Sequence, residues 1–306
     1  MFVTGVVPAI SSAVRKLTTP GENVLIQTPV YNIFFNSIVN NGRNVLESPL
    51  KYRDGAYEID FGDLEEKLAD PQTTMMILCN PQNPVGKIWD RETLARIGAL
   101  CRKHHVIVLS DEIHCDLTAP GREYIPFASV SEDCRENSVT CLAPTKAFNL
   151  AGLQTAAIMV PNEALRNKMH RAINTDEVAE PNAFAVEAAV AAFTKGEAWL
   201  DALRAYIEEN RRLAKRWLAE RIPKLWPVDG EATYLLWLGL PGGFWGTRRS
   251  LPDICGKPPG CMCRRAHSTG DAARRSCASI SPAPERRWRT GCGGWKPGCR
   301  CMRSGR

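Results

Sequence analysis

The 306-residue sequence lacks any apolar run long enough to span a membrane. Its N-terminus is apolar but lacks the basic start and the small-residue cleavage site of a signal peptide. The five cysteines of the first 243 residues lack the spacing of disulfide partners, as expected of reduced thiols. These absences argue against a membrane protein and a disulfide-stabilised secreted domain, and they predict a cytoplasmic protein.

Residues 244–306 have almost no aliphatic periodicity and few acidic side chains. They carry 14 Lys or Arg and 3 Asp or Glu, a net +11, so the first 243 residues carry −5 of the total +6. They also hold seven of the 12 cysteines. A stretch with so little aliphatic surface cannot offset its ordering entropy, and we expect it to be disordered.

Two functional alternatives for this tail rest on weak signals. The cysteines at Cys261, Cys263, Cys299 and Cys301 have C-x-C spacing, not the paired C-x₂-C spacing of a zinc ribbon. Basic residues around Trp288 and Trp295 have a composition compatible with nucleic-acid binding. The expectation is that the chain binds neither a metal nor a nucleic acid.

The first 240 residues contain short, continuous apolar runs separated by helical periodicity. Such runs are typical of parallel strands that are covered on both faces. The predicted strands are residues 21–28, 74–79, 106–110, 138–142, 155–160 and 231–238. Helices are predicted within residues 1–20 and over 60–68, 90–104, 163–173, 184–193 and 199–216. The pattern predicts an α/β fold with a mostly parallel central sheet flanked by helices.

Lys146 follows one of these predicted strands and stands beside Thr145. A primary amine that is held at a strand end and withdrawn from water is a nucleophile. The Thr145 hydroxyl can bind an anionic group, and a helix expected after Phe148 would add amide donors. A Schiff base between Lys146 and the aldehyde of pyridoxal phosphate needs such a set. Taken alone, the pair favours an ordinary surface lysine in a turn.

Polar side chains follow two other predicted strands. Asp111 and His114 come at the carboxyl end of the strand over 106–110, where ligands bind in open α/β sheets. A half-buried carboxylate there needs a cationic partner, which a protonated pyridine nitrogen would supply. Asn83 lies in a turn with two Asn-Pro steps, which fix the direction of its amide. The alternatives are a helix cap for Asp111 and a plain β-turn for Asn83.

Three further residues are candidates for ligand contact near the N-terminus. Gly5 and Val6 begin a predicted helix, whose free amides form an anion site. Tyr31 follows a predicted strand and can stack on a flat ligand. An ordinary helix start and an ordinary core tyrosine remain open at these positions.

Together these motifs resemble the fold-type-I pyridoxal-phosphate enzymes of the class I/II aminotransferase superfamily, in particular the cystathionine β-lyase-like branch, or cysteine-S-conjugate β-lyases. The resemblance covers residues 2–240, and His114, where most aminotransferases have Tyr, favours the lyase branch. Its motifs are Thr4-Gly-Val-Val-Pro8, Pro29-Val-Tyr31, Asn80-Pro-Gln-Asn-Pro-Val-Gly86, Ser110-Asp-Glu-Ile-His114, Pro144-Thr-Lys-Ala-Phe-Asn-Leu-Ala-Gly152 and Thr233-Tyr-Leu-Leu-Trp237.

The resemblance assigns a role to each candidate. Lys146 would bind the cofactor covalently and then move protons at the substrate Cα, while Asp111 would pair with the pyridine nitrogen. Asn83 would hydrogen-bond the ring oxygen O3′, with His114 close to that oxygen. Tyr31 would stack on the ring. The residues that would hold the phosphate are Gly5, Val6 and Thr145.

The implied reaction is α,β-elimination from L-cystathionine or a related L-cysteine S-conjugate, which releases a thiol, pyruvate and ammonia. The implied assembly is a homodimer. Two alternatives stay open. One is a pyridoxal-phosphate-dependent aminotransferase, and the other is a chain that binds the cofactor without turnover.

The sequence departs from the family at both ends. The family has an N-terminal segment before the Gly-Val-Val-Pro stretch, and this sequence starts without it. After Leu240 the likeness stops, and so the arginine that would clamp the substrate carboxylate is missing. With permitted third bases, shifting the reading frame turns Gly260-Cys-Met-Cys-Arg into Leu-Tyr-Val-Ser and Arg275-Ser-Cys-Ala-Ser-Ile into Phe-Leu-Arg-Ile-Asn. We therefore expect a frame-shifted, non-native tail.

The resulting domain prediction has three parts. Residues 1–194 are predicted to form the cofactor-binding large domain, and residues 195–243 an incomplete small α/β domain. Residues 244–306 are predicted to be the disordered tail.

Overall fold

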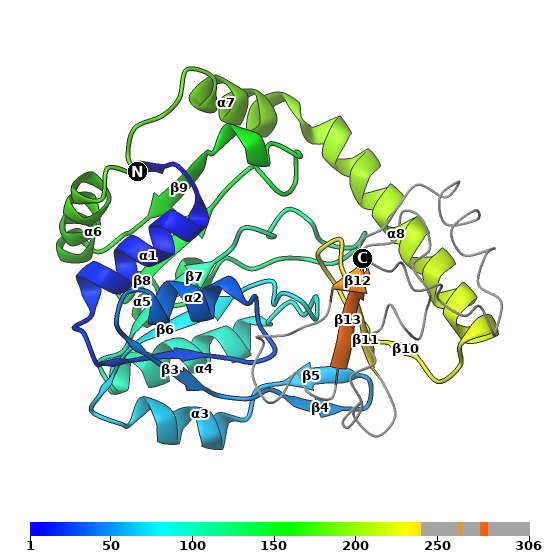
Figure 1. Cartoon of the computed structure of the whole chain (residues 1–306), viewed down its shortest axis with the longest axis horizontal. Coiled ribbons are helices and arrows are strands. Elements are labelled where there is room, and N and C mark those ends of the chain that lie inside the picture. Colours follow the sequence, from blue (N-terminus) through cyan, green and yellow to red (C-terminus); the bar gives the residue numbers. More distant parts are fainter. Residues whose placement is uncertain (240–262, 265–275, 281–306) are drawn as a thin grey trace, which may run out of the picture.

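The computed structural model describes residues 1–239, 263–264 and 276–280. Its main sheet has seven strands in the order β1-β9-β8-β7-β6-β2-β3 (Figure 1). Neighbouring strands from β3 to β8 are parallel, whereas β9 is antiparallel to both β8 and β1. These strands are β1 (Phe2–Val3), β2 (Asn23–Ile26), β3 (Asn44–Glu47), β6 (Thr73–Cys79), β7 (Ile107–Asp111), β8 (Ser138–Leu142) and β9 (Ala156–Met159). The predicted α/β fold with a mostly parallel sheet is confirmed.

Helices cover both faces of this sheet, because successive side chains of a strand point to opposite faces. In β2, Val24 and Ile26 join a core formed with α1, α2 and α6, whereas Leu25 joins the opposite core, formed with α3, α4 and α5. The first set is α1 (Val6–Leu17), α2 (Ile33–Val39) and α6 (Glu163–Thr175). The second set is α3 (Phe61–Leu68), α4 (Arg91–Lys103) and α5 (Glu132–Glu136). Two buried faces explain why the central strands β2, β6, β7 and β8 are mostly apolar and buried.

The chain then continues through α7 (Ala185–Lys195) and the long α8 (Glu197–Arg221) (Figure 1). A second sheet has the order β10-β11-β13-β12, with antiparallel neighbours. Its strands are β10 (Trp226–Pro227), β11 (Leu236–Gly239), β12 (Cys263–Arg264) and β13 (Ser276–Ile280). The remaining elements are the hairpin of β4 (Lys51–Arg53) and β5 (Ala56–Glu58), and the 3₁₀ turns η1 (Phe127–Ser129) and η2 (Ala151–Leu153).

The short strands β12 and β13 lie within the tail for which the sequence predicts disorder. The other residues after 239 lie outside the described residues, and with them Cys261, Cys299, Cys301, Trp288 and Trp295 of the candidate zinc and nucleic-acid motifs. Of Cys263 and the rest of β12 and β13 only the backbone is described. The division into three parts and the frame shift stay predictions.

Two sequence predictions about local structure are wrong. The helix expected after Phe148 is only the 3₁₀ turn η2, because Asn149 and Gln154 on either side adopt left-handed backbone angles, with φ of 56° and 47°. The strand expected over 231–238 begins only at Leu236, because Thr233 is also left-handed, with φ of 68°. A left-handed residue interrupts both helices and strands.

Candidate active site

The carboxyl ends of the parallel strands bring four predicted site residues to one edge of the sheet. Tyr31 follows β2, Asn83 follows β6, Asp111 ends β7 and Lys146 follows β8. Because these strands are adjacent and parallel, their last residues lie side by side. Open α/β sheets bind their ligands at this edge.

The register of β1 brings the N-terminal candidates to the same edge. Val3 pairs with Ala156, and β9 in turn runs antiparallel to β8. The chain therefore leaves β1 in the direction in which it leaves β8, and Gly5 and Val6 follow at once. Gly5 is the N-cap of α1 and has no side chain to cap it, so the first amides of the helix remain available to an anion.

Asp111 is a buried carboxyl group, with a side chain only 5% exposed. Burial raises its pKa to about 7, while the backbone amide of Ile113, which donates to Oδ1 at 3.1 Å, and the Lys146 ammonium act in the opposite direction. Among the described residues, no ion pair joins Asp111 to a cationic side chain within 4.0 Å. A buried carboxylate without a cationic partner is costly, so a bound ligand with a positive charge would stabilise it.

His114 is buried beside Asn83, whose amide nitrogen lies 3.4 Å from Nε2. Burial and the nearby Lys146 charge lower the pKa of His114 to about 3, so the imidazole is neutral. Its Nδ1 has no hydrogen-bond partner among the described residues. The structure thus brings together His114 and Asn83, as the resemblance implied.

Lys146 is half-buried in the turn after β8, next to Thr145. Its charge acts on both Asp111 and His114, since it lowers the pKa of each group. The Asp111 carboxyl group and the neutral His114 imidazole therefore both lie within the electrostatic reach of the Lys146 amine. Tyr31 is 36% exposed at the end of β2, where its ring meets Phe34 edge-on at 5.9 Å.

The loop that carries Asn83 is fixed by Gln82, which sequence reasoning missed. Gln82 is fully buried, and its side-chain amide donates to the carbonyls of Gln27 and Pro29, each at 2.9 Å. These bonds tie the Asn83 loop to the segment that carries Tyr31. A glutamine between two Asn-Pro steps was the available signal.

Glu112 is the second residue that the sequence did not single out. It accepts hydrogen bonds from the Ser110 hydroxyl at 2.8 Å and from the Phe127 amide at 3.1 Å, and burial raises its pKa. These contacts anchor the chain directly after Asp111. The signal was the acidic pair Asp-Glu, in which only the first member was interpreted.

Gly86 closes the Asn83 loop and gives a first prediction. Its φ of 74° suits glycine, and a Cβ there would lie 2.7 Å from the Ala232 carbonyl oxygen. Gly86→Ala should lower the free energy of unfolding by about 1–3 kcal/mol, measured by urea denaturation. Gly121→Ala is the matched control, because Gly121 has φ of 79° but open space around it. Equal losses in the two variants would show that the Ala232 contact is irrelevant.

Within the described ranges, none of the helices combines the length and the hydrophobicity that a bilayer span requires. The described residues also contain no cluster of three or more side chains suited to a metal ion.

Comparison with known sequences identifies related proteins. The chain is 48% identical over 237 residues to the cystathionine beta-lyase PatB of Bacillus subtilis. The matched region covers 78% of this chain and 61% of PatB. It is 34% identical over 242 residues to the protein MalY of Escherichia coli, again covering 78% and 61% of the two chains. The chain thus spans about 61% of the length of these curated relatives.

Comparison with solved structures gives the same fold. Cystalysin from Treponema denticola, whose crystal structure contains pyridoxal 5′-phosphate, matches with a TM-score of 0.90 and 29% identity over 96% of this chain and 74% of its own. A pyridoxal-phosphate-bound C–S lyase from Staphylococcus hominis matches with a TM-score of 0.86 and 31% identity, covering 96% and 72%. The family model for aminotransferase class I and II matches residues 1–248. The resemblance read from the sequence motifs is therefore confirmed, and the chain belongs to the class I and II aminotransferase family.

Proposed function

We propose that the chain binds pyridoxal phosphate and acts as a C–S β-lyase on L-cystathionine or related L-cysteine S-conjugates. The observation that carries the proposal is the buried carboxyl group of Asp111, which lacks a cationic partner among the described residues and lies within the electrostatic reach of the Lys146 amine. The relatives named as cystathionine β-lyase and C–S lyase favour elimination among the reactions open to this family.

The donor set suits this cofactor. A pyridine nitrogen is the cation that a buried Asp111 needs, and a protonated ring supports the cofactor as an electron acceptor. Asn83 and His114 would hold the ring oxygen, and Tyr31 would cover the ring. The uncapped start of α1 at Gly5 and Val6, together with the Thr145 hydroxyl, would hold the phosphate.

Lys146, Asp111 and His114 would have different roles in the elimination. When bound, pyridoxal phosphate withdraws electrons from the Cα of an attached amino acid. The Lys146 amine would take the proton from Cα of the substrate. The electron pair left at Cα would form the Cα–Cβ double bond as the thiolate leaves Cβ with the electrons of the C–S bond, and water would hydrolyse the resulting enamine to pyruvate and ammonia. Asp111 would hold the pyridine nitrogen and keep it positively charged. His114 is neutral, because its pKa is lowered to about 3, and it would therefore not replace the ring nitrogen as the cation beside Asp111.

The experiment is to incubate the purified chain with pyridoxal phosphate and L-cystathionine, without a keto acid. Pyruvate formation supports the lyase. Turnover that requires a keto-acid acceptor would instead identify an aminotransferase, the alternative from the same family. Cofactor absorbance without either product would support a chain that binds the cofactor but does not turn over.

We further propose a homodimer in the cytoplasm. Four large apolar side chains at the start and along one face of α7 are between 47% and 71% exposed, which is unusual for a surface that meets only water. They are Phe184, Val186, Val190 and Phe193. Sedimentation of the chain tests the dimer. The five free cysteines among the described residues support a reducing location.

A further inference from the structure

The turn between β10 and β11 contains a strained residue close to the candidate active site. Thr233 is β-branched, yet it adopts a left-handed backbone with φ of 68°. Threonine avoids this conformation, so it persists only where surrounding contacts enforce it. Strained residues of this kind concentrate near functional sites. The contacts that hold the Thr233 turn in place therefore bear on the site next to it.

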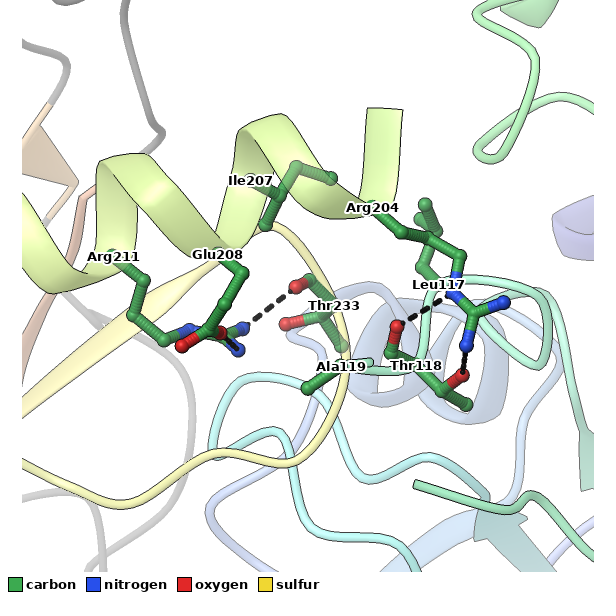
Figure 2. Close-up of a pocket in the computed structure, with 8 residues that line it drawn as sticks. All are labelled: Leu117, Thr118, Ala119, Arg204, Ile207, Glu208, Arg211 and Thr233. Carbon is green, nitrogen blue, oxygen red and sulfur yellow. Dashed lines mark hydrogen bonds and ion pairs between the residues drawn. The ribbon is translucent and has the colours of Figure 1, made fainter. Parts of the chain in front are cut away.

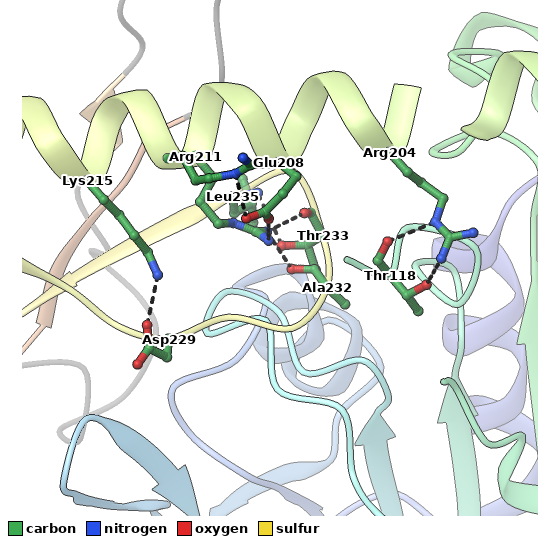
Figure 3. A network of polar contacts seen from close by, with 10 residues as sticks. Thr118, Arg204, Glu208, Arg211, Lys215, Asp229, Ala232, Thr233 and Leu235 are labelled. Carbon is green, nitrogen blue, oxygen red and sulfur yellow. Dashed lines mark hydrogen bonds and ion pairs between the residues drawn. The ribbon is translucent and has the colours of Figure 1, made fainter. Parts of the chain in front are cut away.

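Arg211 of α8 is the side chain that holds the turn. Its Nη2 donates to the carbonyls of Ala232 at 3.2 Å and Thr233 at 2.9 Å (Figure 3). The arginine is only 6% exposed, and Glu208 pairs with its other terminal nitrogen at 3.1 Å. From the other side, the Thr233 amide donates to the Leu117 carbonyl at 2.8 Å. A planar guanidinium that reaches two successive carbonyls fixes the peptide between them.

A second arginine of the same helix fixes the facing segment. Arg204 donates through Nε to the Thr118 carbonyl at 2.9 Å and through Nη2 to the Thr118 hydroxyl at 2.7 Å. Figure 2 shows Arg204 and Arg211 extending from α8 toward the two segments, on either side of a small pocket. Thr118 lies four residues after His114. The helix thereby holds both the Thr233 turn and the segment that follows His114.

The turn presents Tyr234 to the candidate site. The Tyr234 ring meets the His114 ring edge-on, with centroids 5.7 Å apart and an angle of 71° between the planes. Tyr234 also packs in the small cluster that contains Ala147, the neighbour of Lys146. His114 also lies against Asn83, whose amide nitrogen is 3.4 Å from Nε2. If the turn moved, the His114 ring would therefore lose its contact with the Tyr234 ring.

We propose that Arg211 is a positioning residue, which fixes the Thr233 turn so that Tyr234 holds His114 against Asn83, where the pair meets the ring oxygen of the cofactor. This inference rests on the proposed function for its link to the cofactor. The contacts among Arg211, Tyr234 and His114 do not depend on it.

The test compares Arg211→Met and Arg211→Lys with Arg212→Met. Arg212 is the matched control, because it also pairs with Glu208, at 3.6 Å, but its side chain is 70% exposed. In the chain loaded with pyridoxal phosphate, Arg211→Met should shift the pH midpoint of the cofactor's visible absorbance by about 0.5–1 unit, since the ring oxygen loses an ordered partner. It should also lower kcat about tenfold with little change in KM. Arg211→Lys should recover part of the loss, and Arg212→Met should match the parent chain.

A second readout needs no cofactor. In the ¹⁵N-labelled chain without pyridoxal phosphate, the His114 ring signals should move in Arg211→Met and in Tyr234→Leu but not in Arg212→Met. Unmoved His114 signals in a folded Arg211→Met protein would overturn the inference. If that variant does not fold, Tyr234→Leu decides by the same criterion. A parent chain that gives no visible band with the cofactor refutes the proposed function, while moved His114 signals would still support the positioning role.

Discussion

Replacing Lys146 by alanine is expected to abolish covalent attachment of pyridoxal phosphate. It should also lower pyruvate formation by about 10²–10⁴-fold from the lost proton transfer alone. The physical reason is that, in the function proposed above, the amine after β8 would be both the nucleophile for the cofactor aldehyde and the base at Cα. Borohydride reduction followed by intact-mass measurement detects the attachment, and lactate dehydrogenase coupling detects the pyruvate.

Two controls separate chemistry from charge in this experiment. Lys146→Arg keeps a cation near Asp111 and His114 but removes the nucleophile, so it should also lose attachment. Lys215→Ala removes a surface lysine that pairs with Asp229 at 2.8 Å, and it should keep both attachment and turnover. Covalent cofactor in the reduced Lys146→Ala chain would show that another amine carries the chemistry.

The sequence predicted which residues lie at the carboxyl edge of the sheet, because the patterns that mark them involve only neighbouring residues. Each apolar run ends directly before its polar residue, and parallel pairing then places Asp111 beside the strand that leads to Lys146. No long-range knowledge is needed beyond the direction of the strands. For the same reason the strands and helices that were predicted within residues 1–194 lie close to those of the structure, apart from the helix after Phe148. The short elements β1, α2, β3, β4, β5 and α5 were not predicted.

The errors fall where a distant contact decides the local backbone. Thr233 lies in a run that reads as a strand, but a left-handed conformation, held by Arg211 from 22 residues earlier, delays β11 to Leu236. Gln82 was likewise invisible, since its role depends on carbonyls of Gln27 and Pro29 more than 50 residues away. Hydrophobic periodicity carries no information about such hydrogen bonds.

Replacing Asp111 by asparagine should lower kcat/KM for pyruvate formation by about 10²–10³-fold. Breaking a buried ion pair by removing one partner costs about 3–5 kcal/mol, and here the pair would be the carboxylate and the ring nitrogen. Asp63→Asn is a suitable control, because Asp63 pairs with Lys67 on the partly exposed face of α3. Turnover in Asp111→Asn equal to that of the parent chain would exclude the assigned role.

The same substitution should have the opposite effect on the stability of the cofactor-free chain. Burial raises the pKa of Asp111 to about 7 from an ordinary value of 3.8, so between these pH values the folded state holds a proton that the unfolded state has released. Stability from this group is therefore lost as the pH rises through that window. Asp111→Asn has no such loss and should gain on the parent by a few kcal/mol between pH 4 and pH 8.

Comparing the two chains isolates Asp111 from the other buried group. His114, whose pKa is lowered to about 3, costs stability as the pH falls below 6.5, but it does so in both chains and cancels in the difference. Urea unfolding of each chain at pH 5 and pH 8 measures the effect, and equal pH dependence would mean that Asp111 already has a cationic partner. Bound pyridoxal phosphate should reverse the order at pH 8, since its ring nitrogen stabilises the ionised carboxylate that only the parent possesses. A carboxyl group that destabilises the empty chain and stabilises the loaded one is retained for the ligand, not for the fold.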